Sequence, residues 1–469
     1  MPNVVYCEYI IVKENDVMKI IVIGCGKIGT TLIESLILEG HDIVAIDTNA
    51  DVITSVTNIY DVMGVCGSGC DCDTLFEADA ENTDLVISVT DSDELNLLSC
   101  FLARRMGARH TVARVRNTDY DDKDIAFMKQ HLEVSMVINP EKLAAGELYN
   151  VLKLPSAAKV ETFSTGRLEM VELVLKPESA LCDMKLIDIR KKFPVKFLVC
   201  AVQRGDEVYI PSGDFKLQSG DKIGIVASQS EIFRFFKSVK SLQKQAHDVM
   251  ILGASRTTYY LAQKLISTGS DVKVIERERE RCEKFSESVP GAVVIHGDGA
   301  QQELLMEEGI STMDAFVSLT GMDEENILIS YFASSQNVPK VITKINREEF
   351  FPIANKMGLE SIASPKKTVA DVLVRYARSL ENAMGSKIET LYNIMDKKAE
   401  AIEFIVPNDS KVLGVQLKDL KLKPNILVAG IIRGRKPIIP SGDDMILSGD
   451  RVIIFSTGRK LSDLSEIMK

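Results

Sequence analysis

The chain has 469 residues, 45% of them apolar and 26% charged, a composition typical of a folded protein with several domains rather than a disordered one. The 67 acidic residues outnumber the 56 basic ones, and the resulting net charge of −11 makes nucleic acid or anionic lipid a poor candidate for a partner. No stretch approaches the roughly 18 consecutive apolar residues needed to span a bilayer, so we expect any role at a membrane to depend on a partner.

The cysteines are spread thinly over the chain, and the N-terminus carries no signal-peptide pattern, which favours a reduced cytosolic setting. They are Cys7, Cys25, Cys66, Cys70, Cys72, Cys100, Cys182, Cys200 and Cys282. Cys66, Cys70 and Cys72 form a cluster that could hold a metal, but no histidine lies near them in the sequence and no CxxC pair is present. We therefore interpret them as small, partly buried thiols and expect no metal site.

In chain order, residues 1–17 form a leader of uncertain role, because Met18-Lys19-Ile20 itself resembles a natural start. Over residues 18–138, short β-branched runs alternate with helical patterns. The expected strands are Ile20–Ile23, Ile43–Ile46, Asp61–Val65, Leu85–Val89 and Thr111–Val115, and the clearest helices are Ile28–Leu38 and Asn96–Met106. This alternation predicts βαβ units, and hence a parallel sheet with helices on both faces.

A different kind of segment follows. Residues 139–158 are expected to form a helical connector, and residues 159–240 a small α+β domain. Its short strands, such as Phe197–Val202 and Ile223–Val226, are separated by Pro, Gly and Asp turns. The same order then recurs, with an α/β domain over 247–365, a helical connector over 366–388 and a second small α+β domain over 389–469.

The recurrence is an internal duplication. Gly24 aligns with Gly253 at an offset of 229 residues, and IPSGD at 210–214 aligns with IPSGD at 439–443 at the same offset. At an offset of 230, Thr90 falls on Thr320 and Asn96 on Asn326. So steady an offset predicts a tandem duplication, in which each copy is a Rossmann-like, doubly wound parallel-sheet domain followed by a small α+β C-domain.

A nucleotide-binding pattern opens the first copy. Gly24-Cys25-Gly26-Lys27-Ile28-Gly29 is a GxGxxG sequence between an apolar strand and an amphipathic helix. Gly24 permits the tight turn, Gly26 lets the backbone approach a pyrophosphate, and Gly29 lets the helix pack on the strand. The N-terminus of the helix offers N–H groups to phosphates. Asp47 ends the next strand, where it can accept hydrogen bonds from ribose hydroxyls, which favours NAD(H) or an adenine nucleotide over NADP.

Three further loops follow strands of the first copy. Gly67 and Ser68 come after the third strand, Thr90 after the fourth, and Arg114 ends the fifth, where it could meet a phosphate or simply be a solvated charge. Ligands of open α/β sheets bind outside the carboxyl ends of the strands. We therefore include these residues in the expected nucleotide site.

The second copy departs from the glycine pattern. Gly253 keeps the turn, but Ser255 and Thr258 replace the second and third glycines, and a Cβ at Ser255 restricts the approach of a pyrophosphate. The residues that could compensate or complete a second site are Arg256, Thr257, Thr258, Glu276, Asp298, Thr320 and Lys344. Whether this copy binds a nucleotide stays open, with an altered affinity or preference as the expectation.

No catalytic grouping stands out. An oxidoreductase would add a general base near the nicotinamide, commonly His or Lys. The five histidines, His41, His110, His131, His247 and His296, have no counterparts in the other copy, and no Ser/His/Asp set, HExxH or P-loop is evident. We therefore expect a protein that is not an enzyme and has no catalytic residues, with an NAD-dependent oxidoreductase as the alternative.

The chain resembles the TrkA family in having two nucleotide-binding domains, each followed by a small domain with the IPSGD and SGD sequences. Members of this family are cytosolic regulatory subunits of Trk potassium-uptake systems. They are built from domains that regulate the conductance of potassium. The resemblance covers essentially all of 18–469. It implies NAD(H), or additionally ATP or ADP, as ligands of the N-domains, whose binding biases a ring that gates a membrane-embedded potassium channel subunit.

The same resemblance implies a location that is cytoplasmic and peripheral on the inner face of the membrane. The nucleotide contacts that it implies are Gly24, Gly26, Gly29, Asp47, Gly67, Ser68, Thr90 and Arg114 in the first copy and Gly253, Glu276, Asp298 and Thr320 in the second. From the duplication we also expect a fused dimer that associates into a homo-oligomer, a tetramer of chains. A nucleotide-sensing subunit of another transporter is the remaining alternative.

Overall fold

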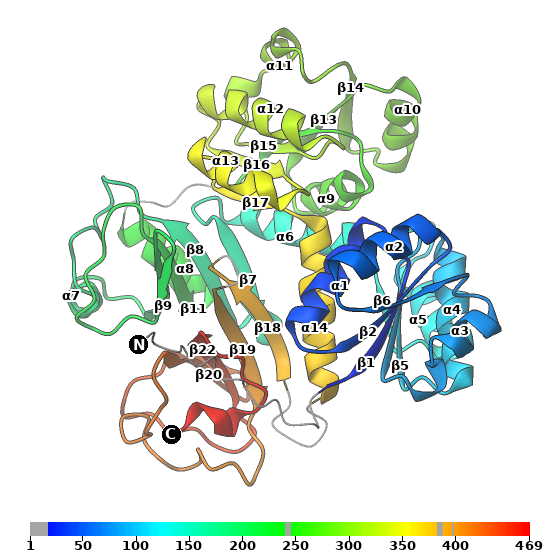
Figure 1. Cartoon of the computed structure of the whole chain (residues 1–469). Helices are drawn as coiled ribbons and strands as arrows, with labels where there is room; N and C mark the ends of the chain where they lie inside the picture. The colour runs from blue at the N-terminus through cyan, green and yellow to red at the C-terminus, as the bar shows by residue number, and fades with distance from the viewer. Residues whose placement is uncertain (1–16, 240–244, 382–387, 396–397) are drawn as a thin grey trace, which may run out of the picture. The chain divides into compact units, whose positions relative to one another are not determined.

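The computed structural model describes residues 17–239, 245–381, 388–395 and 398–469 (Figure 1). They fall into two compact units. One contains the described residues up to Asn139 together with Val372–Ala377, and the other contains the described residues of Pro140–Asp371 and Arg378–Lys469. Within the described ranges, no helix combines the length and apolar character that crossing a membrane requires.

The first unit is built around a six-stranded parallel sheet with the order β3-β2-β1-β4-β5-β6. Its strands are β1 (Lys19–Ile23), β2 (Asp42–Asp47), β3 (Met63–Cys66), β4 (Leu85–Ser88), β5 (His110–Arg114) and β6 (Met136–Ile138). Its helices are α1 (Lys27–Leu38), α2 (Ala50–Ile59), α3 (Cys72–Glu77), α4 (Asp93–Met106) and α5 (Asp122–His131). Helices α1 and α2 lie on one face of the sheet and α3 and α4 on the other, as right-handed crossovers require (Figure 1).

A second parallel sheet in the other unit repeats this order, as β14-β13-β12-β15-β16-β17. Its strands are β12 (Asp248–Leu252), β13 (Asp271–Glu276), β14 (Ala292–His296), β15 (Ala315–Ser318), β16 (Lys340–Lys344) and β17 (Ser361–Ala363). Its helices are α9 (Arg256–Ser267), α10 (Arg279–Ser288), α11 (Gln302–Glu307), α12 (Asp323–Ser335) and α13 (Phe351–Lys356). The tandem duplication and the Rossmann-like fold class predicted from the sequence are thus confirmed.

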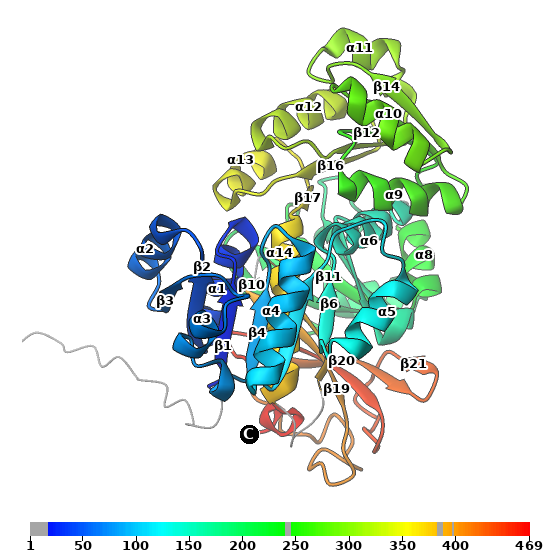
Figure 2. The same cartoon turned by 90° about the vertical axis from the view of Figure 1, so that its right-hand side faces the viewer.

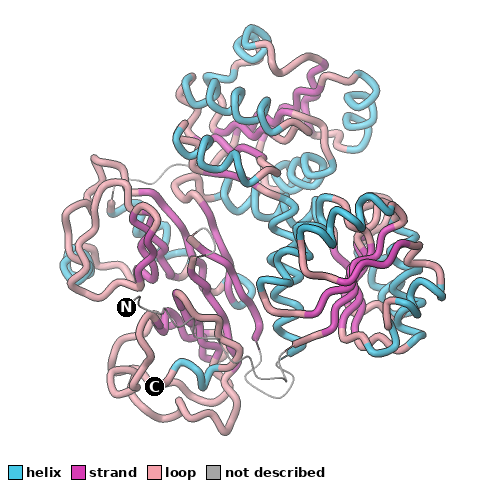
Figure 3. Tube along the Cα trace, in the orientation of Figure 1, coloured by secondary structure: helices cyan, strands magenta, loops and turns pink. Residues whose placement is uncertain are grey.

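Each small C-domain contains a five-stranded antiparallel sheet, with the orders β10-β9-β11-β8-β7 and β18-β19-β22-β20-β21 (Figure 3). The first is formed by β7 (Lys159–Phe163), β8 (Leu168–Val174), β9 (Phe197–Arg204), β10 (Glu207–Tyr209) and β11 (Lys222–Ala227), with α7 (Leu186–Lys192) and α8 (Gln229–Ser238). The second is formed by β18 (Ile388–Ile394), β19 (Ala399–Ile405), β20 (Ile426–Arg433), β21 (Lys436–Ile438) and β22 (Arg451–Thr457).

The two C-domains pack on one another through a shared apolar core, in which Phe163 and Met170 of the first meet Ala401 and Phe455 of the second. Polar contacts fix the pairing. The buried carboxylate of Glu403 accepts hydrogen bonds from the backbone N–H of Ser164, at 3.0 Å, and from its hydroxyl. The two small domains of the duplication therefore pack against each other within one chain.

The expected connectors are helical, as α6 (Pro140–Lys153) and α14 (Pro365–Glu381), but they do more than connect (Figure 2). Leu148 and Leu152 of α6 are buried against Leu261 and Leu265 of α9, so α6 completes the core of the second N-domain. Val372–Ala377 of α14 belongs with the first compact unit. Each connector thus contributes to the N-domain of the other copy.

The start of one strand differs from the expected position because of the helix that precedes it. The strand expected at Asp61–Val65 begins only at Met63, because α2 continues to Ile59 and Val62 N–H donates to the Tyr60 carbonyl in the intervening turn. The leader 1–17 lies outside the described residues except for its last residue. The domain boundaries given above remain our proposal.

Candidate nucleotide-binding clefts

In the first copy, the glycine-rich turn joins β1 to α1 in a backbone conformation that only glycine adopts easily. Gly24 has φ of +91°, and a Cβ there would lie 2.9 Å from the backbone nitrogen of Thr90. Gly26 is the N-cap of α1 and supplies no side-chain cap to its first turn. A Cβ on Gly26 would meet nothing within 4 Å. The space over the helix N-terminus is therefore open to a phosphate group, which the N–H groups of the first turn would bind.

Gly29 has a purely steric role. A Cβ at this position would lie 1.9 Å from the carbonyl oxygen of Gly24, so the close contact of α1 with the turn requires glycine. Lys27 and Ile28, the first two residues of α1, precede it in the same turn. The assignment of Gly29 to helix packing therefore agrees with the geometry.

Asp47, the last residue of β2, holds the glycine-rich turn. Its Oδ2 accepts a hydrogen bond from Cys25 N–H at 2.8 Å, and its Oδ1 accepts one from Asn49 N–H at 2.9 Å. Each carboxylate oxygen keeps a further lone pair for a ribose hydroxyl. Burial, with the charge of Asp47 as a second cause, raises the pKa of the Cys25 thiol to about 12, so this cysteine is a protonated core residue.

The remaining expected residues of the first copy lie in the neighbouring loops. A Cβ on Gly67 would be 2.4 Å from Thr74 Oγ1, and Ser68 Oγ accepts a hydrogen bond from Cys70 N–H at 3.2 Å. The guanidinium of Arg114, whose side chain is 5% exposed, donates to the Thr90 carbonyl and to Asp91 Oδ1. The structure therefore gives Arg114 a role in holding the β4–α4 loop, besides the phosphate contact that the sequence suggested.

Asn96 is a supporting residue that sequence reasoning did not place in the site. Buried on α4, it accepts hydrogen bonds from Thr90 N–H at 2.7 Å and Thr90 Oγ1 at 2.8 Å, and it donates to the Arg114 carbonyl at 2.9 Å. Asn326 makes the same set of contacts in the second copy, to Thr320 and the Lys344 carbonyl. The sequence did contain a signal for this role, because the asparagine recurs in the second copy at the offset of 230 residues.

The second copy contains a cleft of about 350 Å³ at the carboxyl ends of its strands. It brings together six of the expected residues, Gly253, Ser255, Glu276, Asp298, Thr320 and Lys344. Arg277, Arg281 and Lys344 add positive charge to its lining. Arg256 is exposed and does not line this cleft, so the structure gives no support for its place among the residues of a second nucleotide site.

The altered turn of the second copy is stabilised by its own side chains. Ser255 Oγ caps α9 by accepting a hydrogen bond from Thr258 N–H at 3.2 Å, and the Thr258 hydroxyl donates to the Gly253 carbonyl at 2.6 Å. Glu276 repeats the role of Asp47, with its Oε2 accepting from Ala254 N–H at 2.8 Å. The serine hydroxyl thus occupies the helix N-terminus that a phosphate would use in the first copy.

The cysteine cluster does not form a grouping suited to a metal among the described residues. Cys70 Sγ lies 3.3 Å from Ser99 Oγ, Cys66 Sγ lies 3.8 Å from the Thr48 carbonyl oxygen, and Cys72 is exposed. Within the described ranges, a spacing that could hold an ion is found at His247, Asp248 and Asp271, which are exposed or half-buried at the start of β12 and β13.

Comparisons with known proteins agree with this architecture. The profile of the TrkA-N domain matches residues 20–140 and 249–365, and that of the TrkA-C domain matches residues 170–240 and 401–469. "Trk system potassium uptake protein TrkA homolog 1" of Methanosarcina mazei is 31% identical over 463 residues, covering 96% of this chain and 100% of that protein. "Trk system potassium uptake protein TrkA" of Vibrio alginolyticus is 30% identical over 459 residues, covering 96% and 99%.

Solved structures support the fold. The GsuK RCK domain superposes with a TM-score of 0.62 at 17% identity, covering 95% of this chain and 94% of that chain. A GsuK channel bound to NAD gives a TM-score of 0.62 at 17% identity, covering 95% of this chain and 78% of that one. At these identities the likeness concerns the fold alone.

Proposed function

The chain belongs to the TrkA family, and from that premise we propose that it is a cytosolic, nucleotide-sensing regulatory subunit of a Trk-type potassium transporter. The observation that carries the proposal is the uncapped N-terminus of α1 beside Asp47, in a turn where two glycines have no tolerable substitute. The ligand would be NAD(H), with ATP or ADP as an alternative or additional one, as the ligands named for GsuK structures suggest.

The nucleotide site that we propose for the first copy, formed by Gly24–Gly29, Asp47 and Thr90 and called the first cleft from here on, supplies each part that such a ligand needs. The backbone of Gly24 to Gly29 would hold the pyrophosphate at the helix N-terminus, and Asp47 would accept hydrogen bonds from a ribose. Thr90, fixed by Asn96, would form the opposite wall. In the second cleft, Ser255 competes with a phosphate for the helix N–H groups, so we propose that the first cleft binds more tightly.

Regulation would follow from differential binding. If two nucleotides differ in affinity for two conformations of an assembly, exchanging one for the other shifts the population between them. We propose that this shift gates a membrane-embedded potassium channel subunit, which would hold the chain at the inner face of the membrane. The role is regulatory and needs no catalysis.

Calorimetric titration of the full chain with NADH, NAD, ATP and ADP tests this function. We expect saturable binding of at least one of them, with the NADH absorbance at 340 nm unchanged during incubation, and lower potassium uptake in cells from which the chain is deleted. Stoichiometric oxidation of NADH would instead place the protein among the oxidoreductases. Normal uptake without the chain would contradict the regulatory role.

We further propose that the chain is a fused dimer that associates into a tetramer of chains. The internal pairing of the C-domains already satisfies the contact that a single-copy homologue would need a partner to make. Light scattering at micromolar concentration should therefore give a mass several times that of one chain. A single-chain mass with and without nucleotide would contradict the assembly but not the binding.

A further inference from the structure

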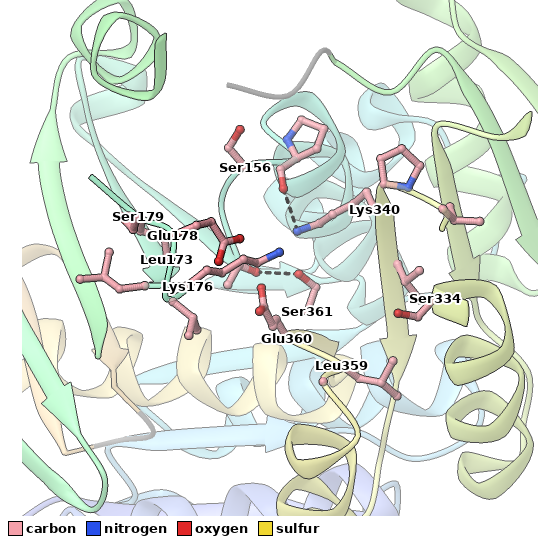
Figure 4. Close-up of a pocket in the computed structure, with 18 of the residues that line it drawn as sticks. Ser156, Leu173, Lys176, Glu178, Ser179, Ser334, Lys340, Leu359, Glu360 and Ser361 are labelled. Carbon is pink, nitrogen blue, oxygen red and sulfur yellow. Dashed lines mark hydrogen bonds between the residues drawn. The ribbon is translucent and has the colours of Figure 1, made fainter. Parts of the chain in front are cut away.

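A cavity of about 470 Å³ lies in the second unit, away from the second nucleotide cleft (Figure 4). Its walls are the linker 155–158 between α6 and β7, the turn that follows β8, and the segments 338–341 and 358–361 that lead into β16 and β17. These segments lie where β16 and β17 begin, whereas the nucleotide cleft lies where the strands end. The residues that line the two cavities do not overlap.

A buried ammonium group lies at the wall of this cavity. Lys340, the first residue of β16, is only 7% exposed. Its Nζ donates hydrogen bonds to the carbonyl oxygens of Pro155 at 3.2 Å and Ala157 at 2.6 Å. Figure 4 shows this side chain reaching from β16 toward the linker, while Lys176 reaches into the same space from the opposite wall.

The two carbonyl oxygens do not satisfy this group completely. An ammonium has three N–H donors, and two of them are used. Among the described residues, no carboxylate forms an ion pair with Lys340, and burial therefore lowers its pKa to about 8, an effect that the more distant Glu360 partly opposes. Because a buried cation without a counterion is costly, the cavity favours an anionic group beside Lys340.

The rim of the cavity limits the charge of a ligand. Lys176, Glu178 and Glu360 line it and are exposed, and together they carry one net negative charge. The ammonium of Lys340 balances that charge, so a ligand with several negative charges is disfavoured more strongly than one with a single charge. Polar groups make up the larger part of the exposed lining, and the nearly buried side chains of Leu173, Leu181 and Leu359 lie behind it. This mixed lining suits a small ligand with a short apolar body.

We infer that this cavity binds a small organic monocarboxylate, whose carboxylate accepts a hydrogen bond from Lys340 Nζ and whose apolar part lies against the leucines of the wall. The site is independent of the proposed nucleotide function. In the first copy, the position equivalent to Lys340 at the offset of 230 is His110, so the site belongs to the second copy. A bound carboxylate would strengthen the contact between β16 and the linker to β7.

Titration of the full chain with 3-methylbutanoate, with acetate and inorganic phosphate as comparisons, tests this inference. At pH 7 we expect saturable binding of 3-methylbutanoate, weaker binding of acetate, and no binding of phosphate at the same concentrations. Affinity should fall about ten-fold between pH 7 and pH 9, because an ammonium with a pKa of about 8 loses its proton over that range.

Three variants make the result specific. Lys340→Met should reduce the affinity at least ten-fold. Ser334→Phe should block the cavity from the exposed end of α12, where the Ser334 side chain makes no hydrogen bond to any residue that the structure describes. Lys356→Met removes an exposed lysine of the same domain that does not line the cavity, and it should bind as the wild type does. Nucleotide titrations should be unchanged in all three.

Several outcomes would overturn the site. One is that neither carboxylate binds at concentrations up to 10 millimolar, roughly the weakest affinity that defines a site. Another is that Lys340→Met or Ser334→Phe binds 3-methylbutanoate as tightly as the wild type does. The last is that phosphate binds more tightly than 3-methylbutanoate. Since Ser334→Phe leaves Lys340 and its two carbonyl partners intact, a folding defect in the lysine variant cannot mask the answer.

Discussion

Gly29→Ala should destabilise the first N-domain by about 2–4 kcal/mol, a large effect for the addition of one methyl group. The new Cβ would lie 1.9 Å from the Gly24 carbonyl oxygen, and since both groups belong to the backbone frame, no rotamer change relieves the overlap. Either α1 moves away from β1 or the turn deforms, and each would also weaken nucleotide binding. Hydrogen exchange of peptides from β1 and α1 measures the loss, because it reports on this domain separately from the other three.

Thr258→Ala provides the matched control in the second copy. Thr258 occupies the equivalent position, but its hydroxyl donates to the Gly253 carbonyl at 2.6 Å instead of clashing with it. The same hydroxyl lies 2.9 Å from Ser255 Oγ, so its removal should cost about 1–2 kcal/mol, the usual value of two hydrogen bonds. Comparable exchange in Gly29→Ala and the wild type would contradict the steric role of this glycine.

The nucleotide turn could be predicted from sequence because its requirements are local. A positive φ at Gly24 and the absence of a Cβ at Gly29 follow from six consecutive residues between one strand and one helix. Asp47 was predictable for the same reason, since it ends the strand that pairs directly with β1. Each of these constraints acts over a short segment of chain, and sequence patterns report such constraints well.

The packing partners of the connectors could not be predicted in the same way. The apolar face of α6 shows that the helix is buried on one side, but hydrophobic periodicity does not name the surface that covers it. That surface is α9, more than a hundred residues away in the chain. The capping role of Ser255 was also not predicted from the sequence. Its position suggested only a steric obstacle to a pyrophosphate, whereas the structure shows that its side chain caps α9.

The role of Lys340 was equally hidden. A lysine at the start of a strand is usually solvated, and only the folded chain brings the carbonyl groups of Pro155 and Ala157 to its ammonium. The interaction joins residues that are 183 and 185 positions apart in sequence. Such contacts depend on how domains meet within a unit, which local patterns do not encode.

Gly26→Val should abolish most nucleotide binding in the first cleft while leaving the fold intact. The backbone of Gly26 has φ of −69° and ψ of −167°, an extended conformation open to any residue, and a Cβ there would meet no atom within 4 Å. The branched side chain would instead fill the space that a pyrophosphate needs above the N-terminus of α1. Thermal unfolding monitored by circular dichroism should stay within about 0.5 kcal/mol of the wild type, and calorimetry should show at least a ten-fold loss of affinity.

Asp47→Asn extends the test from the phosphates to the ribose. The amide keeps one oxygen as an acceptor for the N–H of Cys25 or Asn49, but its NH₂ group cannot accept from the other or from a ribose hydroxyl. We expect a loss of about 1–3 kcal/mol in binding free energy, with Glu276→Gln in the second cleft as the matched variant.

If the first cleft is the sensor, combining Gly26→Val with Asp47→Asn should leave a folded chain, and potassium uptake should no longer respond to nucleotide. An unchanged nucleotide response in the double variant, or a larger loss of affinity in Glu276→Gln than in Asp47→Asn, would move the sensing site to the second copy.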